Sequence, residues 1–193
     1  MASRARSAIG FSVHTGWAVA VVVGGTPSEP SVLARTRLEL LKPEDGVVRF
    51  VFHSVEEKPL GEARKVVQRA REATRRNAEA EVKRLVGGLE APVVAAGLVL
   101  PAGKVPEELE TILKAHTLIH SAEGALFREA LKGACESLGI RVERVPRKAV
   151  FADAGMKKTV DGMKKALGPP WGADQKQAMA LGWMALSGRG ARI

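Results

Sequence analysis

The side chains best suited to chemistry include two histidines and a glutamate at helical spacing. His116, His120 and Glu123 lie at positions i, i+4 and i+7 of one expected helix, so they share a stripe about two turns long. Two imidazoles one turn apart can chelate a transition metal, and the glutamate could be a third ligand or a base. The spacing differs from the His-Glu-x-x-His pattern of zinc proteases, and residues that only pack or form hydrogen bonds share it. The stripe is therefore a candidate site with a structural alternative.

Two further polar residues stand at the ends of expected elements. His14 lies in the turn of an expected hairpin, and Asp174 lies in the first turn of the expected last helix. The aspartate could have a functional role. Stabilisation by the exposed amide groups and the dipole of the helix explains its position equally well. If these side chains converge with the stripe, they make a general acid/base site. The members of that candidate catalytic site are His14, His120, Glu123 and Asp174. A divalent metal, the sole cofactor left open, would be held by His116, His120 and Asp174.

Positive charge is the second chemical feature of the chain. The formal net charge is +9 and the isoelectric point is about 10.1, which favours a polyanionic partner, either RNA or DNA. Between Lys58 and Val86 there are nine Lys or Arg residues and four Glu, an excess of five. The alternative for this segment is a solvated helix with i,i+4 ion pairs. The residues expected to contact nucleic acid are Arg64, Lys65, Arg69, Arg75, Arg76, Lys148, Lys157 and Lys158.

Hydrophobic periodicity predicts an alternation of strands and helices in one domain, 1–193, with flexible basic ends at 1–7 and 188–193. Apolar runs bounded by turn residues predict five core strands, at 9–13, 17–23, 31–41, 93–100 and 140–145. A further strand at the sheet edge is expected at 47–53. Helical spacing predicts helices at 61–86, 106–114, 115–138, 154–167 and 173–187.

The segment Ile-Gly-Phe-Ser-Val-His-Thr-Gly-Trp-Ala-Val, residues 9–19, resembles the opening hairpin of the RNase H-like superfamily, in particular the RuvC-type Holliday-junction resolvases. Shorter matches lie at 94–97 and 172–177, and the element order agrees over most of the chain. The resemblance implies an α/β, RNase H-like three-layer fold. It has a mixed five-stranded central sheet with helices on both faces.

The resemblance also implies where catalytic acids would stand. In this superfamily an aspartate on the first strand holds the catalytic magnesium, and here Ser12 takes its place. Gly97 stands where the second carboxylate is expected, and only Asp174 matches a metal-binding acid. Two-metal hydrolysis needs several carboxylates around two ions roughly 4 Å apart. The sequence therefore argues against a standard two-metal nuclease.

Composition excludes other classes of protein. The apolar runs are far shorter than the roughly 20 residues of a membrane span, so no membrane association is expected. The start, Met-Ala-Ser-Arg-Ala-Arg-Ser, lacks the apolar core of a signal peptide. A single Cys135 cannot form an internal disulfide, which fits a reducing cytoplasm. Whether the chain forms a homodimer stays open.

Two functional hypotheses follow. In the first, the chain is a catalytically degenerate RNase H-like module that binds structured nucleic acid or a nucleoprotein partner through 64–76, Lys148 and 157–165. In the second, it is an enzyme, a metal-dependent hydrolase or nuclease, with a rebuilt His/Glu/Asp site in the same cleft.

Overall fold

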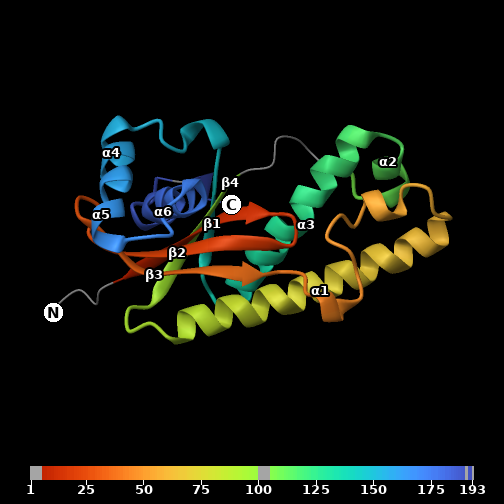
Figure 1. Ribbon diagram of the computed structural model, residues 1–193, viewed down its shortest axis with the longest axis horizontal. Coiled ribbons are helices and arrows are strands. Elements are labelled where there is room, and N and C mark those ends of the chain that lie inside the picture. Colours follow the sequence, from red (N-terminus) through yellow and green to blue (C-terminus); the bar gives the residue numbers. More distant parts are fainter. Residues whose placement is uncertain (1–5, 100–104, 190, 193) are drawn as a thin grey trace.

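A mixed sheet between two helical layers organises the protein, as the computed structural model shows for residues 6–99, 105–189 and 191–192 (Figure 1). The strand order is β3-β2-β1-β4-β5-β6. Strands β1, β2 and β3 form an antiparallel meander, β4 and β5 run parallel to β1, and β6 is antiparallel to β5. The strands are β1 (Ser7–His14), β2 (Trp17–Gly25), β3 (Pro30–Glu39), β4 (Val93–Val99), β5 (Arg141–Val145) and β6 (Ala191–Arg192). The predicted five-stranded mixed core is present, with a two-residue sixth strand at its edge.

The opening hairpin forms because two β-branched, apolar runs flank a turn that a glycine can make. Gly16 has φ +85°, a left-handed conformation that side-chain-bearing residues rarely adopt. Its carbonyl accepts hydrogen bonds from the backbone N–H groups of Leu40 and Leu41, at 2.9 and 3.0 Å. The turn thereby also fixes the end of β3, so the first three strands meet beside His14.

Two layers of helices cover the sheet, one on each face. Helices α1 (Leu60–Gly87) and α3 (His116–Ser137) bury their apolar stripes on one face, with α2 (Leu109–Leu113) packed against α3. Helix α6 (Ala173–Leu186) crosses the other face, where α4 (Ala154–Gly162) packs against it and α5 (Lys164–Leu167) follows α4. None of the helices in the described part of the chain is long and apolar enough to cross a bilayer.

Helix α6 lies unusually close to the sheet because glycines line its path. A Cβ added to Gly97 would lie 2.7 Å from the carbonyl carbon of Leu181 and closer still to its oxygen. A Cβ on Gly10 would collide with the backbone of Ala178 and Gly182. Backbone therefore rests on backbone, and the start of α6 is positioned beside the end of β1.

Two predictions about elements are corrected by the structure. Residues 47–53 are not a strand: 47–52 form an irregular segment between two 3-10 helices, η1 (Pro43–Asp45) and η2 (His53–Val55), and His53 begins η2. Its Val51 and Phe52 are buried, and a glutamate from α3 accepts the N–H of Phe52 in place of a neighbouring strand. The helix expected at 154–167 is divided into α4 and α5.

The predicted flexible ends are in part ordered. Ser7 lies in β1, is buried, and its hydroxyl donates to the carbonyls of Ala91 and Pro92 at 3.2 Å. Residues 191–192 pair with β5. The other parts of these predicted ends, 1–5, 190 and 193, lie outside the described residues, as does Leu100 at the end of the predicted fourth strand.

Candidate functional site

The end of β1 and the start of α6 bring three polar side chains together. Ser12 Oγ donates a hydrogen bond of 2.8 Å to Asp174 Oδ1, and His14 Nε2 lies 2.7 Å from the same oxygen. Ser12 and His14 share one face of the strand because side chains alternate along it. The cluster therefore follows from strand periodicity and from the close approach of α6, and one carboxylate oxygen serves both neighbours.

The imidazole of His14 is also fixed from its other side. It stacks on Trp17 with ring centroids 4.0 Å apart and planes 6° from parallel, and the Arg37 guanidinium lies 4.0 Å above the Trp17 ring. This stack borders a pocket of about 330 Å³ that also contains Asp174. Arg35 closes the pocket by donating to four backbone carbonyls in the turn before α6, residues 167–170. The sequence had not singled out Arg35 or Arg37.

The end of β4 beside β1 carries no acid. Gly10 pairs with Gly97, and continuing the parallel register by two residues leads to Val99 beside Ser12. Gly97, the position that the resemblance implies for a second acid, has no room for a side chain. Val99 is buried in the apolar cluster under α6. Neither position offers a carboxylate.

These residues do not fit a two-metal magnesium centre. Of Ser12, Val99 and Asp174, only Asp174 offers a carboxylate. Its Oδ1 is engaged by Ser12 and His14. The residues outside the described ranges contain no Asp or Glu. Magnesium prefers charged oxygen ligands, and two ions need several of them. No reaction step through magnesium is supported here.

A second pocket, of about 250 Å³, lies on the other side of His14. His14, His53, His120, Glu123 and Arg128 line it together with apolar neighbours. Three of the four predicted catalytic residues thus face one pocket. The fourth, Asp174, borders the first pocket and meets this one only through its contact with His14.

The predicted metal residues divide in the same way. His116 and His120 approach each other, with their Nε2 atoms 3.0 Å apart, while Asp174 stays with Ser12. The residue that joins the two histidines is His53, from η2. Sequence spacing could not indicate His53, because it lies 63 residues before His116, in a segment that was interpreted as a strand.

Unpaired positive charge lies at and near Arg128, which lines this second pocket. Burial and the nearby Arg147 guanidinium lower the pKa of Arg128, a half-buried residue of α3. Neither arginine, nor the exposed Lys148 that follows Arg147, has an ion-pair partner among the described residues. These residues lie where β1 and β5 end, the carboxyl edge of the parallel part of the sheet, which is where ligands of α/β proteins commonly bind.

The other predicted nucleic-acid-binding residues do not form one surface. Those on α1 are exposed along a helix of 28 residues, while Lys157 and Lys158 lie on α4, across the sheet. Arg75 pairs with Glu79 at 3.0 Å, and Arg76 pairs with Asp45 at 3.2 Å. Lys157 pairs with Asp161 at 2.9 Å. In the described part of the chain no ion pair engages Arg64, Lys65, Arg69 or Lys158.

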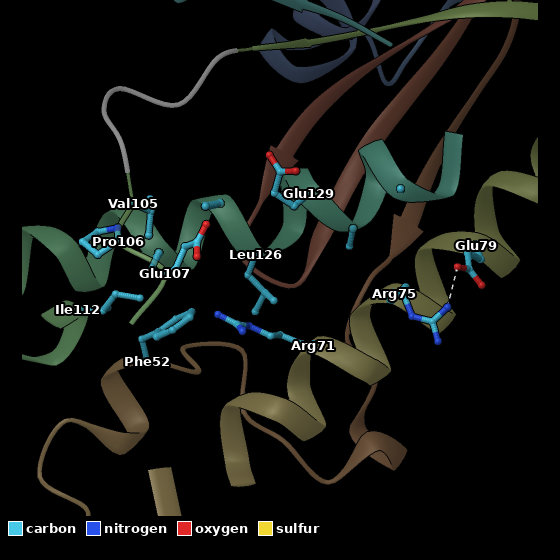
Figure 2. Close-up of a pocket in the computed structure, with 14 residues that line it drawn as sticks. Phe52, Arg71, Arg75, Glu79, Val105, Pro106, Glu107, Ile112, Leu126 and Glu129 are labelled. Atoms are coloured by element: carbon cyan, nitrogen blue, oxygen red, sulfur yellow. Dashed lines mark hydrogen bonds and ion pairs between the residues drawn. The ribbon is translucent and has the colours of Figure 1, made fainter. Parts of the chain in front are cut away.

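An apolar pocket of about 540 Å³ separates α1 from α3 (Figure 2). Phe52, Ile112 and Leu126 form its wall, and charged residues such as Arg71 and Glu107 also line it. Among the described residues its lining contains no histidine, cysteine, serine or threonine, and its titratable groups are Arg71, Arg75, Glu79, Glu107 and Glu129.

Comparison with solved structures decides the fold. Thermus thermophilus RuvC in complex with a Holliday junction substrate aligns with a TM-score of 0.57 at 12% identity, over 97% of this chain and 99% of that one. A second Thermus thermophilus RuvC structure aligns with a TM-score of 0.56 over the same shares, also at 12% identity. The chain has the RNase H-like fold of RuvC. The fold class predicted from the sequence is confirmed. No protein-family model and no curated protein sequence matches the chain.

Proposed function

We propose that this chain is a nucleic-acid-binding domain with a RuvC-like fold that does not cleave its ligand by two-metal chemistry. The observation that carries the proposal is the contact of Ser12 and His14 with one oxygen of Asp174. In a two-metal enzyme, the negative charge of several carboxylates is balanced by cations that also hold the scissile phosphate. Here Asp174 is the one carboxylate beside Ser12 and His14, and its Oδ1 already contacts both of them. A single carboxylate is too few to hold two ions.

The positive carboxyl edge supports binding to phosphates. Arg128 lines the pocket that contains His14, Arg147 lies near Arg128, and the exposed Lys148 follows Arg147 in the chain. None of the three has an acidic partner in the described part of the chain. A phosphate entering there would gain hydrogen bonds from guanidinium groups and relieve the repulsion between the two arginines. Thermus thermophilus RuvC was solved with a Holliday junction substrate, which makes a four-way DNA junction the first ligand to test.

Binding is tested by fluorescence anisotropy with a labelled four-way junction, a matched duplex and a structured RNA at several salt concentrations. Lys148→Glu should weaken binding at least tenfold and reduce the slope of log K against log[salt] by about one or more. The control is Lys83→Glu, the same charge change near the end of α1 that leads into β4, at the opposite edge of the sheet. Lys83→Glu should change affinity less than twofold. Absence of binding to every polyanion at low salt, or equal losses in both variants, would refute the proposal.

Loss of cleavage is tested separately with the same ligands. Wild-type protein incubated with Mg²⁺ or Mn²⁺ should leave junction, duplex and RNA intact, and Asp174→Asn should behave identically. Metal-dependent cutting by the wild type that disappears in Asp174→Asn would show that the acid still works in catalysis.

One observation favours the second candidate function, an enzyme with a rebuilt site. His14, His120 and Glu123 face one pocket, and Asp174 contacts the far nitrogen of the His14 ring, as an orienting group would. Such an enzyme would cleave phosphodiesters with a dependence on His14 and Glu123. A cleavage activity that survives Asp174→Asn in part and disappears in His14→Ala would favour this candidate over a binding domain.

A further inference from the structure

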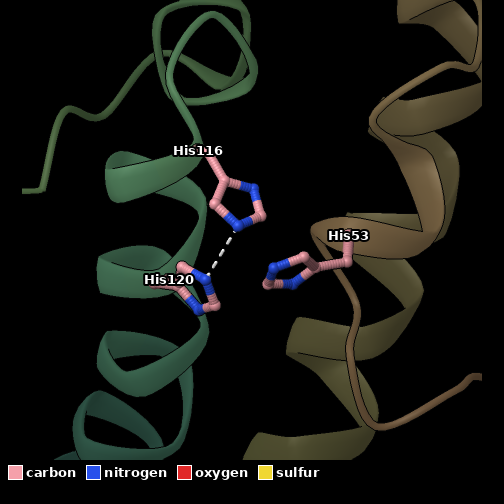
Figure 3. Close-up of side chains that lie close together, drawn as sticks. All are labelled: His53, His116 and His120. Atoms are coloured by element: carbon pink, nitrogen blue, oxygen red, sulfur yellow. Dashed lines mark hydrogen bonds between the residues drawn. The ribbon is translucent and has the colours of Figure 1, made fainter.

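Three histidines from two separate elements meet at one point on the surface. His53 begins η2, and His116 and His120 lie one turn apart on α3. The ring centroid of His53 lies 5.3 Å from that of His116 and 4.7 Å from that of His120, and the latter two are 4.5 Å apart. One ring nitrogen from each residue lies within 4.8 Å of the others (Figure 3). The rings point toward one another around a small common space.

Packing and hydrogen bonding alone explain this arrangement poorly. His116 and His120 are exposed, so neither is needed to fill the core. Their Nε2 atoms are 3.0 Å apart, a distance at which one nitrogen must present a lone pair to the other's proton. Full protonation of all three rings would place three positive charges together. A bound cation would accept the lone pairs of all three.

Glu123 adds the feature that distinguishes a metal site from a chance cluster. Its Oε1 lies 3.1 Å from His53 Nδ1 and also accepts the backbone N–H groups of Phe52 at 2.8 Å and His53 at 3.3 Å. With the proton on Nδ1, where Oε1 can accept it, His53 Nε2 keeps the lone pair that a metal ion needs. Metal-binding histidines commonly hold their second nitrogen against a carboxylate in this way.

The second carboxylate oxygen of Glu123 is enclosed by the protein. The glutamate side chain is 5% exposed, and Oε2 is buried with no hydrogen-bond partner among the described residues. A buried carboxylate oxygen without a partner is costly unless positive charge lies nearby. A divalent ion bound by His53 Nε2 would supply that charge through the ring.

We propose that His53, His116 and His120 bind one transition-metal ion of the Zn²⁺ type, with Glu123 as the positioning residue behind His53. Imidazole nitrogen suits zinc and its first-row neighbours, and three histidines leave a fourth position for water or an anion. His53 and His120 also line the pocket that contains Arg128. The ligand set differs from the one expected from the sequence, because His53 replaces Asp174. This inference does not depend on nucleic-acid binding.

The chain itself offers a matched set of variants, since it contains four histidines and three of them form the cluster. The full-length protein, stripped with chelator, is titrated with Zn²⁺ by calorimetry and with Co²⁺ by visible absorption. We expect one ion per chain and a Co²⁺ spectrum typical of four-coordination. His116→Ala and His120→Ala, which change exposed side chains, should each weaken Zn²⁺ binding at least 100-fold, and His14→Ala should leave it within twofold.

Glu123→Gln separates positioning from direct ligation, because it keeps the shape of the side chain and removes the charge. It should weaken Zn²⁺ binding roughly 10- to 100-fold while the Co²⁺ spectrum keeps its form. A hundredfold excess of Zn²⁺ over its Kd should raise the melting temperature of the wild type by about 5 °C or more. Absence of stoichiometric binding at micromolar Zn²⁺, or binding that survives in the His116→Ala/His120→Ala double variant, would overturn the proposal.

Discussion

Replacing Gly97 by alanine should displace helix α6, because the new methyl group has no space. Its carbon would lie 2.7 Å from the carbonyl carbon of Leu181, where non-bonded carbons normally lie about 3.5–4.0 Å apart. The obstacle is helix backbone, which cannot rotate away as a side chain can. The helix must therefore retreat by about 1 Å from β4, along a face where its residues are buried. Overpacking of this kind costs about 1–3 kcal/mol, and a backbone obstacle places Gly97→Ala near the upper end.

The control is Gly133→Ala, the same change in α3 at a position where an added Cβ meets no atom within 4 Å. Alanine in a helix interior is favoured over glycine by about 0.5–1 kcal/mol, so this variant should be slightly more stable than the wild type. For a chain of this size, about 3 kcal/mol corresponds to a fall in melting temperature of roughly 6–12 °C. Thermal unfolding followed by circular dichroism measures both variants. If Gly97→Ala melts within about 2 °C of the wild type, the close approach of α6 to β4 is not as described.

Three other predictions concern the α4–α6 layer and the core. The N–H of Met156 donates to Asp153 and holds the pKa of that carboxyl below its usual range; this contribution is present at neutral pH and is lost as pH falls through the lowered pKa. Asp153→Ala should therefore be less stable than the wild type at pH 7, and the difference in urea unfolding should shrink below about pH 4. Burial raises the pKa of Cys135 to about 12, so a thiol reagent should modify it at pH 8 only in denaturant. Trp171→Phe removes the donor to the buried carbonyl of Val160, a bond of 2.9 Å, and thermal unfolding should show a loss of about 1–3 kcal/mol.

The sheet and its long helices could be predicted from the sequence because their signals are local. Alternating β-branched residues around Gly16 define the hairpin, and the apolar spacing that begins at Ala63 and Val67 defines the buried stripe of α1. The strand predicted at 47–53 was wrong because it, too, was inferred from a local pattern. Its apolar residues favoured a strand, yet Val48 and Phe50 are 57% and 60% exposed, and within 47–53 only Val51 and Phe52 are fully buried. The partner that fixes this segment, Glu123, lies 70 residues away, beyond the reach of any local pattern.

The packing around Gly97 could not be predicted for a different physical reason. The resemblance implies a second acid position at Gly97, but the backbone of Leu181, 84 residues further along the chain, leaves no room for a side chain there. No local pattern indicates that contact. His53 could not be predicted as a site residue either, because it comes close to His116 and His120 only when the chain packs.

The positions of these residues determine the electrostatic character of the carboxyl edge of the sheet. A nuclease edge crowded with carboxylates repels phosphate until cations are bound. Here Ser12 and Val99 contribute no charge beside β1, and Asp174 is held by two neighbours, while Arg128 and Arg147 keep unbalanced positive charge at and near the second pocket. Because no cation has to screen a group of acids, phosphate binding at this edge should need no Mg²⁺. Under the proposed function, this edge would hold a nucleic acid without cutting it.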